Sequence, residues 1–182
     1  MIDSSGARGG CVVWLTGLPS AGKSTIAEAL EAVLARRGAR VQRLDGDEIR
    51  TNLSRGLGFS KDDRDEQVRR VGYVARLLER HGVVAISALV SPYREARDAV
   101  RASAENFVEV YVKCSLEECI RRDVKGLYRR ARGGEIANFT GISDPYEPPL
   151  HPEVVVETDR ERLDDSVKKI LDVLAGKGCV HG

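Results

Sequence analysis

The chain has 182 residues, of which 42% are hydrophobic and 31% charged, and 29 Lys and Arg against 28 Asp and Glu leave a net charge of +1. A chain of this length fits one domain whose core needs no disulfide or metal, and near neutrality argues against a dedicated binder of nucleic-acid polymers. The sequence has no apolar run of membrane-spanning length and no signal-peptide core in MIDSSGARGG, so we expect no membrane association and a cytoplasmic location.

Five short apolar runs rich in β-branched residues alternate with segments of helical periodicity. Runs that are apolar on both faces are typical of parallel strands covered by helices. The alternation predicts an α/β domain with three layers, α/β/α, around a mostly parallel five-stranded sheet. The predicted strands are Cys11–Leu15, Ala39–Leu44, Val83–Val90, Phe107–Cys114 and Val154–Val156.

Three local patterns predict where helices begin. Ser60 with Asp63, and Ser115 with Glu118, have the spacing of a capping box. Pro92 suits the first position of a helix, which makes Ser91 a natural N-cap.

Two stretches interrupt the alternation and predict a lid over residues 121–152. Residues 121–141 are basic and glycine-containing, and residues 144–152 hold four of the six prolines; long irregular segments in a compact domain are usually functional. Six basic residues and one acidic residue give residues 121–132 a charge of +5, whereas two basic and eight acidic residues give residues 144–165 a charge of −6. We therefore expect a flexible arm (1–10), one domain (11–176) and a short tail (177–182).

The four cysteines form neither a CxxC pair nor a zinc-binding pattern. Cys11 and Cys114 lie within apolar runs, so we expect buried, reduced thiols there. The sequence leaves a disulfide at Cys119 open.

A phosphate-binding loop, GLPSAGKS, lies between the first predicted strand and a helix, as the motif G-x-x-x-x-G-K-[ST] requires. The glycines let backbone N–H groups surround a phosphate at a helix N-terminus. In such loops the lysine reaches the β- and γ-phosphates and the serine hydroxyl ligates Mg²⁺. The predicted ATP-binding residues are Gly17, Leu18, Pro19, Ser20, Ala21, Gly22, Lys23, Ser24 and Thr25.

A pair of carboxylates, Asp45 and Asp47, follows the second predicted strand. The third strand, Val83–Val90, has no aspartate in the Walker B position of motor ATPases, and the guanine-reading Asn-Lys-x-Asp motif is absent. Positions i and i+2 of an extended segment point the same way, so both carboxylates are expected to face one cleft. The alternative is an ordinary polar turn.

Arginines and loop aromatics follow this pair. Arg50 and Arg64 are placed to border the same cleft and grip an anionic acceptor, although each is alternatively a solvated helix charge. Phe59 and Phe139 both lie in loops and as a pair suggest a clamp for a planar base such as adenine, while packing beneath its own loop is the alternative for each.

These residues resemble the adenylylsulfate kinase family, from about Val12 to Thr158. The resemblance rests on an ordered set of strings, which is far more specific than a phosphate-binding loop alone. The strings are Gly17 to Ser24, Asp45-Gly-Asp47 with Arg50, Gly58-Phe-Ser with Asp63-Arg64, Ser91-Pro-Tyr-Arg94, Arg122-Asp-Val-Lys-Gly-Leu-Tyr128, Phe139-Thr-Gly-Ile142 and Tyr146-Glu-Pro-Pro149.

The resemblance implies a P-loop kinase fold and transfer of the γ-phosphoryl group of MgATP to the 3′-hydroxyl of adenosine 5′-phosphosulfate (APS), giving 3′-phosphoadenosine 5′-phosphosulfate (PAPS) and ADP. It implies that Lys23, Asp45, Asp47 and Ser91 serve catalysis, with Ser24 and Asp47 directed at magnesium. Arg122 and Thr158 would lie near the ATP base, with helix capping the alternative for Thr158. The acceptor would contact Asp45, Asp47, Arg50, Phe59, Arg64, Gln67, Val90, Ser91, Lys125, Asn138 and Phe139.

Two positions carry particular questions. Gln67 stands where the family usually has Asn, and its amide sits on a longer stem. Ser91 aligns with a serine described in parts of the family as a phosphorylated intermediate, but we favour direct in-line transfer, because phosphoryl transfer needs positioning and charge neutralisation more than a covalent relay.

Two other classes of function remain as rivals: another small-molecule P-loop kinase, and a nucleotide-binding module without catalysis. The carboxylate pair disfavours the module. The resemblance also suggests a homodimer and a functional link to ATP sulfurylase, and we expect the residues after Thr158 to form one helix and a tail rather than a sulfurylase domain.

Overall fold

The computed structural model describes residues 9–180. Within them, five parallel strands form one sheet in the order β2-β3-β1-β4-β5. The strands are β1 (Cys11–Thr16), β2 (Val41–Asp45), β3 (Val84–Ala88), β4 (Phe107–Lys113) and β5 (Val154–Glu157). The five predicted strands are confirmed with ends shifted by two residues or fewer, and every pairing in the sheet is parallel.

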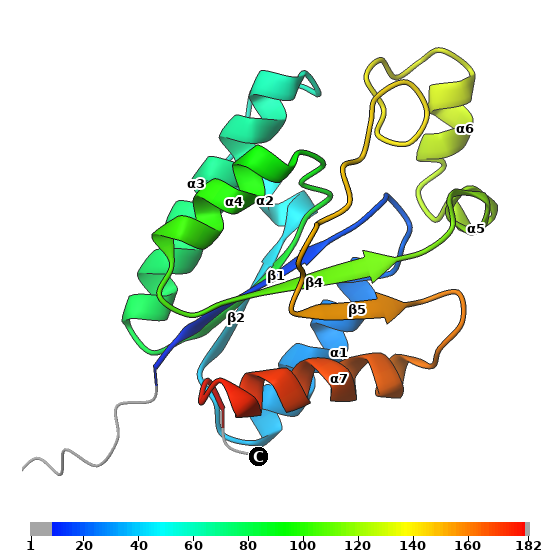
Figure 1. Ribbon diagram of the computed structural model, residues 1–182. Coiled ribbons are helices and arrows are strands. Elements are labelled where there is room, and N and C mark those ends of the chain that lie inside the picture. Colours follow the sequence, from blue (N-terminus) through cyan, green and yellow to red (C-terminus); the bar gives the residue numbers. More distant parts are fainter. Residues whose placement is uncertain (1–8, 181–182) are drawn as a thin grey trace, which may run out of the picture.

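Helices cover both faces of the sheet (Figure 1). One face packs against α2 (Gly46–Asn52), α3 (Lys61–Arg80) and α4 (Arg94–Ser103), and the other against α1 (Lys23–Arg36) and α7 (Leu163–Gly176). Short helices α5 (Leu116–Arg122) and α6 (Leu127–Arg132) stand beyond the carboxyl end of β4. The predicted three-layer α/β architecture is confirmed.

Alternation along β1 divides the core into two halves. Val12 and Trp14 join the cluster beneath α3 and α4, whereas Cys11, Val13 and Leu15 join the cluster beneath α1 and α7. Side chains of successive strand residues point to opposite faces, so a strand buried on both faces must be apolar throughout. This is why β1 reads as an unbroken apolar run.

Both serines of the predicted capping boxes cap their helices. Ser60 accepts a hydrogen bond from the backbone N–H of Asp63 at the start of α3, and Ser115 accepts one from Glu118 at the start of α5. The expected cap at Ser91 is wrong. Helix α4 begins only at Arg94, with Tyr93 in the N-cap position and no side-chain cap.

Only part of the expected arm and tail lies within the described residues. Residues 1–8 and 181–182 of those segments lie outside the described residues. Gly10 is buried beside Glu79, and Cys179 and Val180 are buried against the α1/α7 half of the core. All four cysteines are buried and free, so the disulfide left open for Cys119 is not formed. Within residues 9–180 no helix is both long and apolar enough to cross a bilayer.

Candidate active site

The phosphate-binding loop joins the carboxyl end of β1 to α1. Its close packing requires glycine at two positions. A Cβ on Gly17 would lie 2.4 Å from the Val112 carbonyl oxygen, and Gly22, the N-cap of α1, has a φ of 98°, a conformation that favours glycine. The strand-loop-helix context that the motif requires is therefore met.

Lys23 is the buried cation of this loop. Its ammonium group donates to the carbonyl oxygens of Gly17 at 2.9 Å and Leu18 at 2.7 Å. Burial lowers its pKa to about 8, and the nearby Lys125 acts in the same direction, whereas Cys119 opposes both. An anion bound in the loop would restore the preference for the charged form.

Arg122 and Thr158 brace the loop from the side. The Thr158 hydroxyl donates to the Ala21 carbonyl at 2.7 Å, and the Arg122 guanidinium donates to the hydroxyl and carbonyl oxygens of Thr158 at 3.2 and 2.8 Å. Thr158 does not cap α7, whose N-cap is Arg162, so the helix-capping alternative is wrong. The lid and β5 thus hold the loop through one threonine.

Asp45 and Asp47 are arranged differently from the extended geometry expected of them. Asp45 is the N-cap of α2, and its carboxylate accepts from the backbone N–H of Asp47 at 2.9 Å. Asp47 lies in the first turn of α2 with 73% of its side chain exposed, and it pairs with Lys125 of the lid. The expectation of an extended segment is wrong, because an Asp at this position stabilises a helix start. Both carboxylates nevertheless line one cleft.

Arg50 and Arg64 flank the ring of Phe59. Their guanidinium carbons lie 4.6 and 5.5 Å from the ring centroid. Arg64 is buried and donates to the carbonyl oxygens of Phe59 at 3.0 Å and Asn138 at 2.8 Å. Partial burial lowers the pKa of both arginines, with Arg64 adding to the effect on Arg50. Both guanidinium groups lie in the cleft, so neither is an ordinary solvated helix charge.

The two phenylalanines differ in exposure. Phe59 is 44% exposed, whereas Phe139 is buried and packs edge-on against Tyr128, with ring centroids 5.0 Å apart. The hydroxyl of Tyr128 in turn donates to the Pro19 carbonyl at 3.0 Å. Phe59 and Phe139 both line the cleft, from α3's entry loop and from the lid respectively.

Ser91 follows β3 in a left-handed backbone conformation, with a φ of 38°. Its hydroxyl accepts a hydrogen bond from the indole N–H of Trp14 at 3.1 Å. Residues other than glycine are rarely found there without a compensating structure. Ser91 is buried at the floor of the cleft.

These elements enclose one cleft of about 400 Å³ at the carboxyl end of the sheet. Five of the predicted site residues do not line it: Gly17, Leu18, Ala21, Asn138 and Thr158. The others do: Pro19, Ser20, Gly22, Lys23, Ser24, Thr25, Asp45, Asp47, Arg50, Phe59, Arg64, Gln67, Val90, Ser91, Arg122, Lys125 and Phe139.

Residue-by-residue prediction missed several lining residues. The most informative is Thr140, whose buried hydroxyl oxygen has no hydrogen-bond partner in the described part of the chain. It belongs to the Phe139-Thr-Gly-Ile142 string, which was the available signal. The others are apolar or backbone positions that carry no chemical signature: Gly46, Val68, Ala88, Leu89, Pro92, Val124 and Leu127.

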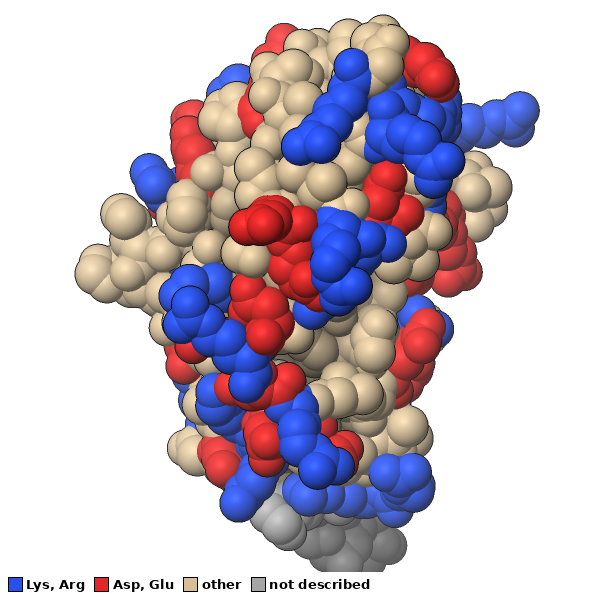
Figure 2. Space-filling view, turned by 90° about the vertical axis from the view of Figure 1, so that its right-hand side faces the viewer, with Lys and Arg blue, Asp and Glu red and all other residues tan. Residues whose placement is uncertain are grey.

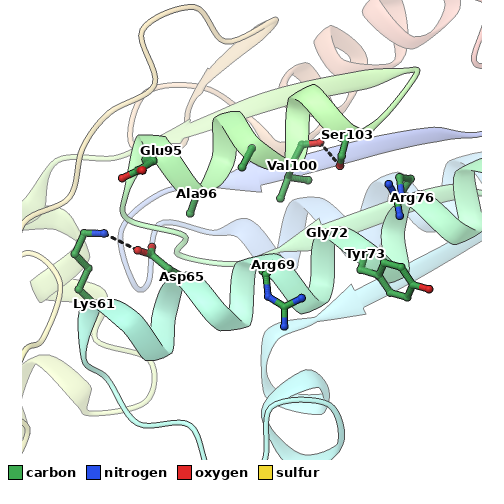
Figure 3. Close-up of a pocket in the computed structure, with 11 residues that line it drawn as sticks. Lys61, Asp65, Arg69, Gly72, Tyr73, Arg76, Glu95, Ala96, Val100 and Ser103 are labelled. Atoms are coloured by element: carbon green, nitrogen blue, oxygen red, sulfur yellow. Dashed lines mark hydrogen bonds and ion pairs between the residues drawn. The ribbon is translucent and has the colours of Figure 1, made fainter.

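A second hollow, of about 480 Å³, lies between α3 and α4 (Figure 3). Its floor is formed by small apolar residues such as Gly72, Ala96 and Val100, and a Lys61–Asp65 ion pair closes one end. It lies away from the loop that binds phosphate. We therefore place the chemistry in the cleft at the sheet edge.

The cleft's oxygen donors suit Mg²⁺. Hydroxyl and carboxylate oxygens from Ser24, Asp45 and Asp47 line it together. Mg²⁺ typically takes one or two protein oxygens and completes its octahedron with phosphate oxygens and water. Between residues 9 and 180 no cluster of three or more His, Cys, Asp or Glu is placed to hold a metal alone, so an ion carried in with a nucleotide fits this donor set.

Comparison with known proteins gives a consistent match. Residues 9–157 match the family model described as adenylylsulphate kinase. An adenylyl-sulfate kinase of Microcystis aeruginosa is 58% identical over 172 residues, which are 94% of this chain and 95% of that protein. A probable bifunctional SAT/APS kinase 2 of Sorangium cellulosum is 55% identical over 171 residues, 94% of this chain but 29% of that protein.

A solved structure also resembles this fold. The Mycobacterium tuberculosis APS kinase, determined in complex with AMPPNP and APS, superposes with a TM-score of 0.86 at 40% sequence identity. The match covers 91% of this chain and 97% of that one. The same architecture therefore extends over nearly the whole length of both proteins.

Proposed function

The chain belongs to the adenylylsulphate kinase family, and from this premise we propose how its cleft transfers the γ-phosphoryl group of ATP to the 3′-hydroxyl of APS. The 3′-oxygen attacks the γ-phosphorus, the bond between that phosphorus and the β–γ bridging oxygen breaks, and PAPS and ADP form. The observation that carries the proposal is that Lys23 and Ser24 share one cleft with Asp47, Arg50 and Phe59.

The loop side of the cleft binds ATP. Backbone N–H groups of residues 20–24 and the Lys23 ammonium hold the phosphates, and Arg122 with Thr158 fixes the loop beside the nucleotide. Ser24 and Asp47 would hold magnesium, with Asp45 in support. Bound there, Mg²⁺ would neutralise charge on the transferring phosphoryl group.

The opposite side binds the acceptor. Arg50 and Arg64 carry fixed positive charge for the phosphosulfate, and Phe59 with Phe139 offers faces for the adenine. Asp47 orients the attacking hydroxyl and accepts its proton, while Lys125, paired with Asp47 in this state, turns to the phosphates. Gln67, Val90, Ser91 and Asn138 complete the acceptor side, and Ser91 acts without being phosphorylated.

An ADP-release assay with APS, AMP or water as acceptor tests the proposal. We expect rapid ADP release only when APS is the acceptor, and we expect the Lys23→Ala variant to release none. Faster release with another acceptor would indicate a different small-molecule kinase, and nucleotide binding without release would indicate a binding module.

Asp47→Asn tests the assignment of the acceptor hydroxyl. The change keeps the shape and removes the charge, so we expect kcat to fall by about 100-fold or more, with ATP affinity unchanged. Asp62→Asn, which changes an exposed carboxyl in the first turn of α3, is the matched control and leaves kcat unaltered. Full turnover in Asp47→Asn would remove Asp47 from the transfer step.

Three further properties belong to the same proposal. APS must be supplied by a reaction that joins sulfate to the adenylyl group of ATP, so we propose a functional link to an ATP sulfurylase. We propose that the protein acts in the cytoplasm. We also propose a homodimer, for which the native mass in solution is expected to be twice that of one chain.

A further inference from the structure

Arg97 of α4 is a buried charge outside the cleft. It is 1% exposed, and its three guanidinium nitrogens bind three separate partners. Nε donates to Glu109 at 2.9 Å, Nη1 to the Ser91 carbonyl at 2.6 Å, and Nη2 to the Glu147 carbonyl at 2.6 Å. One planar group thus joins β4 to two segments that are 56 residues apart in the sequence.

The contacts of Arg97 with the Ser91 and Glu147 carbonyls are not needed to neutralise its charge. Glu109 neutralises Arg97 and is itself bound by Arg101 at 3.0 Å, and Arg101 also pairs with Glu153 at 2.5 Å. Replacing a buried ion pair with apolar residues often leaves stability unchanged or raises it. The bonds to the Ser91 and Glu147 carbonyls therefore point to a role in geometry.

The Ser91 end of the connection is strained. Its positive φ is held by Trp14 on the hydroxyl and, on the carbonyl, by Arg97 at 2.6 Å and more weakly by the Thr16 hydroxyl at 3.4 Å. A strained conformation persists only while its surroundings over-determine it. Without Arg97, the peptide after Ser91 would relax and the floor of the cleft would shift.

The Glu147 end lies in residues 144–152, which we call the strap. The strap is bound to the segment before α4: Glu147 N–H donates to the Pro92 carbonyl at 2.8 Å, and Tyr93 donates to Asp144 at 2.6 Å. It directly follows the lid loop that carries Phe139 and Thr140, both of which line the cleft. Arg97 therefore ties the floor of the cleft to the strap that supports its opposite wall.

We propose that Arg97 is a positioning residue for the acceptor, which sets the spacing between Ser91 and the strap and so the width of the acceptor half of the cleft. This inference rests on the proposed function. Because Arg97 makes no contact with the phosphate-binding loop, its loss affects acceptor binding and transfer and spares ATP binding.

The test compares Arg97→Lys with Arg101→Lys. Each variant keeps a cation beside Glu109, but lysine is a compact charge and cannot reproduce the planar fork that reaches three partners. Arg101 shares Glu109 with Arg97 and contacts neither Ser91 nor Glu147, so it is a matched control. For both we would measure KM for APS, kcat, the AMPPNP dissociation constant and the melting temperature.

We expect Arg97→Lys to raise KM for APS by about tenfold or more and to lower kcat, with the AMPPNP dissociation constant within about twofold of the unmodified enzyme. In Arg101→Lys, KM for APS, kcat and the AMPPNP dissociation constant should all stay within about twofold of the unmodified enzyme. Equal effects of the two variants, or an equal loss of AMPPNP affinity in Arg97→Lys, would overturn the proposal.

A double variant separates an effect of Arg97 on folding from an effect on acceptor binding. Arg97→Gln with Glu109→Gln removes both buried charges together, leaves Arg101 paired with Glu153, and should show the same rise in KM. If neither this variant nor Arg97→Lys folds, the role of Arg97 is structural and the proposal fails. An unmodified enzyme inactive toward APS would instead refute the proposed function.

Discussion

At the scale of single residues, Lys23 is a buried group whose charged form is unfavourable until an anion binds beside it. The buried ammonium group has a pKa of about 8 because burial disfavours its charge. Between pH 8 and the unfolded value near 10.5 the unfolded chain binds more protons, so stability contributed by this group rises with pH in that window. Below pH 8 the folded protein retains a buried, charged lysine.

Proton uptake on nucleotide binding is the first prediction. At about pH 9 the free lysine is mostly neutral, and the phosphates of MgAMPPNP favour its charged form, so binding should take up close to one proton. Calorimetric titrations in buffers of different ionisation enthalpy measure this uptake. At about pH 6.5, where Lys23 is already protonated, uptake by this group should vanish; a binding enthalpy at pH 9 that does not vary with buffer would contradict the assignment.

Thr140→Val gives a second prediction, in which stability and affinity change in opposite directions. The Thr140 hydroxyl oxygen is buried without a partner in the described residues, so an isosteric methyl removes an unsatisfied polar group and should maintain or raise the melting temperature. If the hydroxyl meets the acceptor, KM for APS should rise by about threefold to tenfold, with KM for ATP unaltered. A more stable enzyme with an unchanged KM for APS would show that this hydroxyl has no part in binding.

At the scale of elements, the close contact of α3 with α4 depends on one glycine. A Cβ added to Gly72 would lie 2.5 Å from Val100 Cγ2 and 3.0 Å from its Cγ1. Val100 is β-branched and cannot easily turn away. The two helices, which carry Arg64 and Arg97 respectively, would have to separate.

Gly72→Ala should therefore destabilise the protein by about 1 kcal/mol, because overpacking of about 1–3 kcal/mol exceeds the gain of about 1 kcal/mol in helix propensity. Urea unfolding of Gly72→Ala, Val100→Ala and the double variant measures the coupling, which should be about 1 kcal/mol in favour of the double variant. Gly176→Ala in α7, whose added Cβ meets nothing within 4 Å, is the control and should be neutral or stabilising. Strict additivity would show that α3 and α4 accommodate the methyl group.

At the scale of the whole molecule, the net charge of +1 conceals an uneven distribution of charge. Lys and Arg side chains occur over the whole height of the face in Figure 2, and some of them lie at its upper end, the height at which Figure 1 places α6. The lid holds Arg129 and Arg132 exposed on α6. A local positive field next to the cleft attracts small polyanions even when the total charge is near zero.

We therefore expect the double variant Arg129→Gln with Arg132→Gln to raise KM for APS by about threefold at low salt. This difference should disappear at about 0.5 M salt, because the Debye length is then a few ångströms. Steady-state kinetics across a salt series measures it. The control variant Arg37→Gln with Lys168→Gln removes the same charge from exposed positions at the C-cap of α1 and on α7 and should have little effect. An equal rise in KM for both pairs would show that only total charge matters.

Local signals predicted the five strands and the starts of α3 and α5, whereas the short helices α2 and α6 were not predicted. The apolar runs became the five strands, and Ser60 and Ser115 capped the helices that their spacing indicated. Prediction was wrong where two local preferences competed. Asp47 was expected to continue the extended segment of Asp45 and instead lies in the first turn of α2, which Asp45 caps. Ser91 was expected to be a helix cap and instead has a strained backbone held by Trp14, Thr16 and Arg97.

The sequence by itself determined the layered fold and the phosphate-binding loop, because periodicity, capping and loop motifs act over short stretches of chain, and the family resemblance added further residues of the cleft. Only the tertiary structure decided which distant groups meet: Thr158 on the loop, Lys125 on Asp47, and Arg97 between Ser91 and Glu147. Such contacts depend on where the strands stand in the sheet and how the lid returns to them, and no pattern along the chain records either.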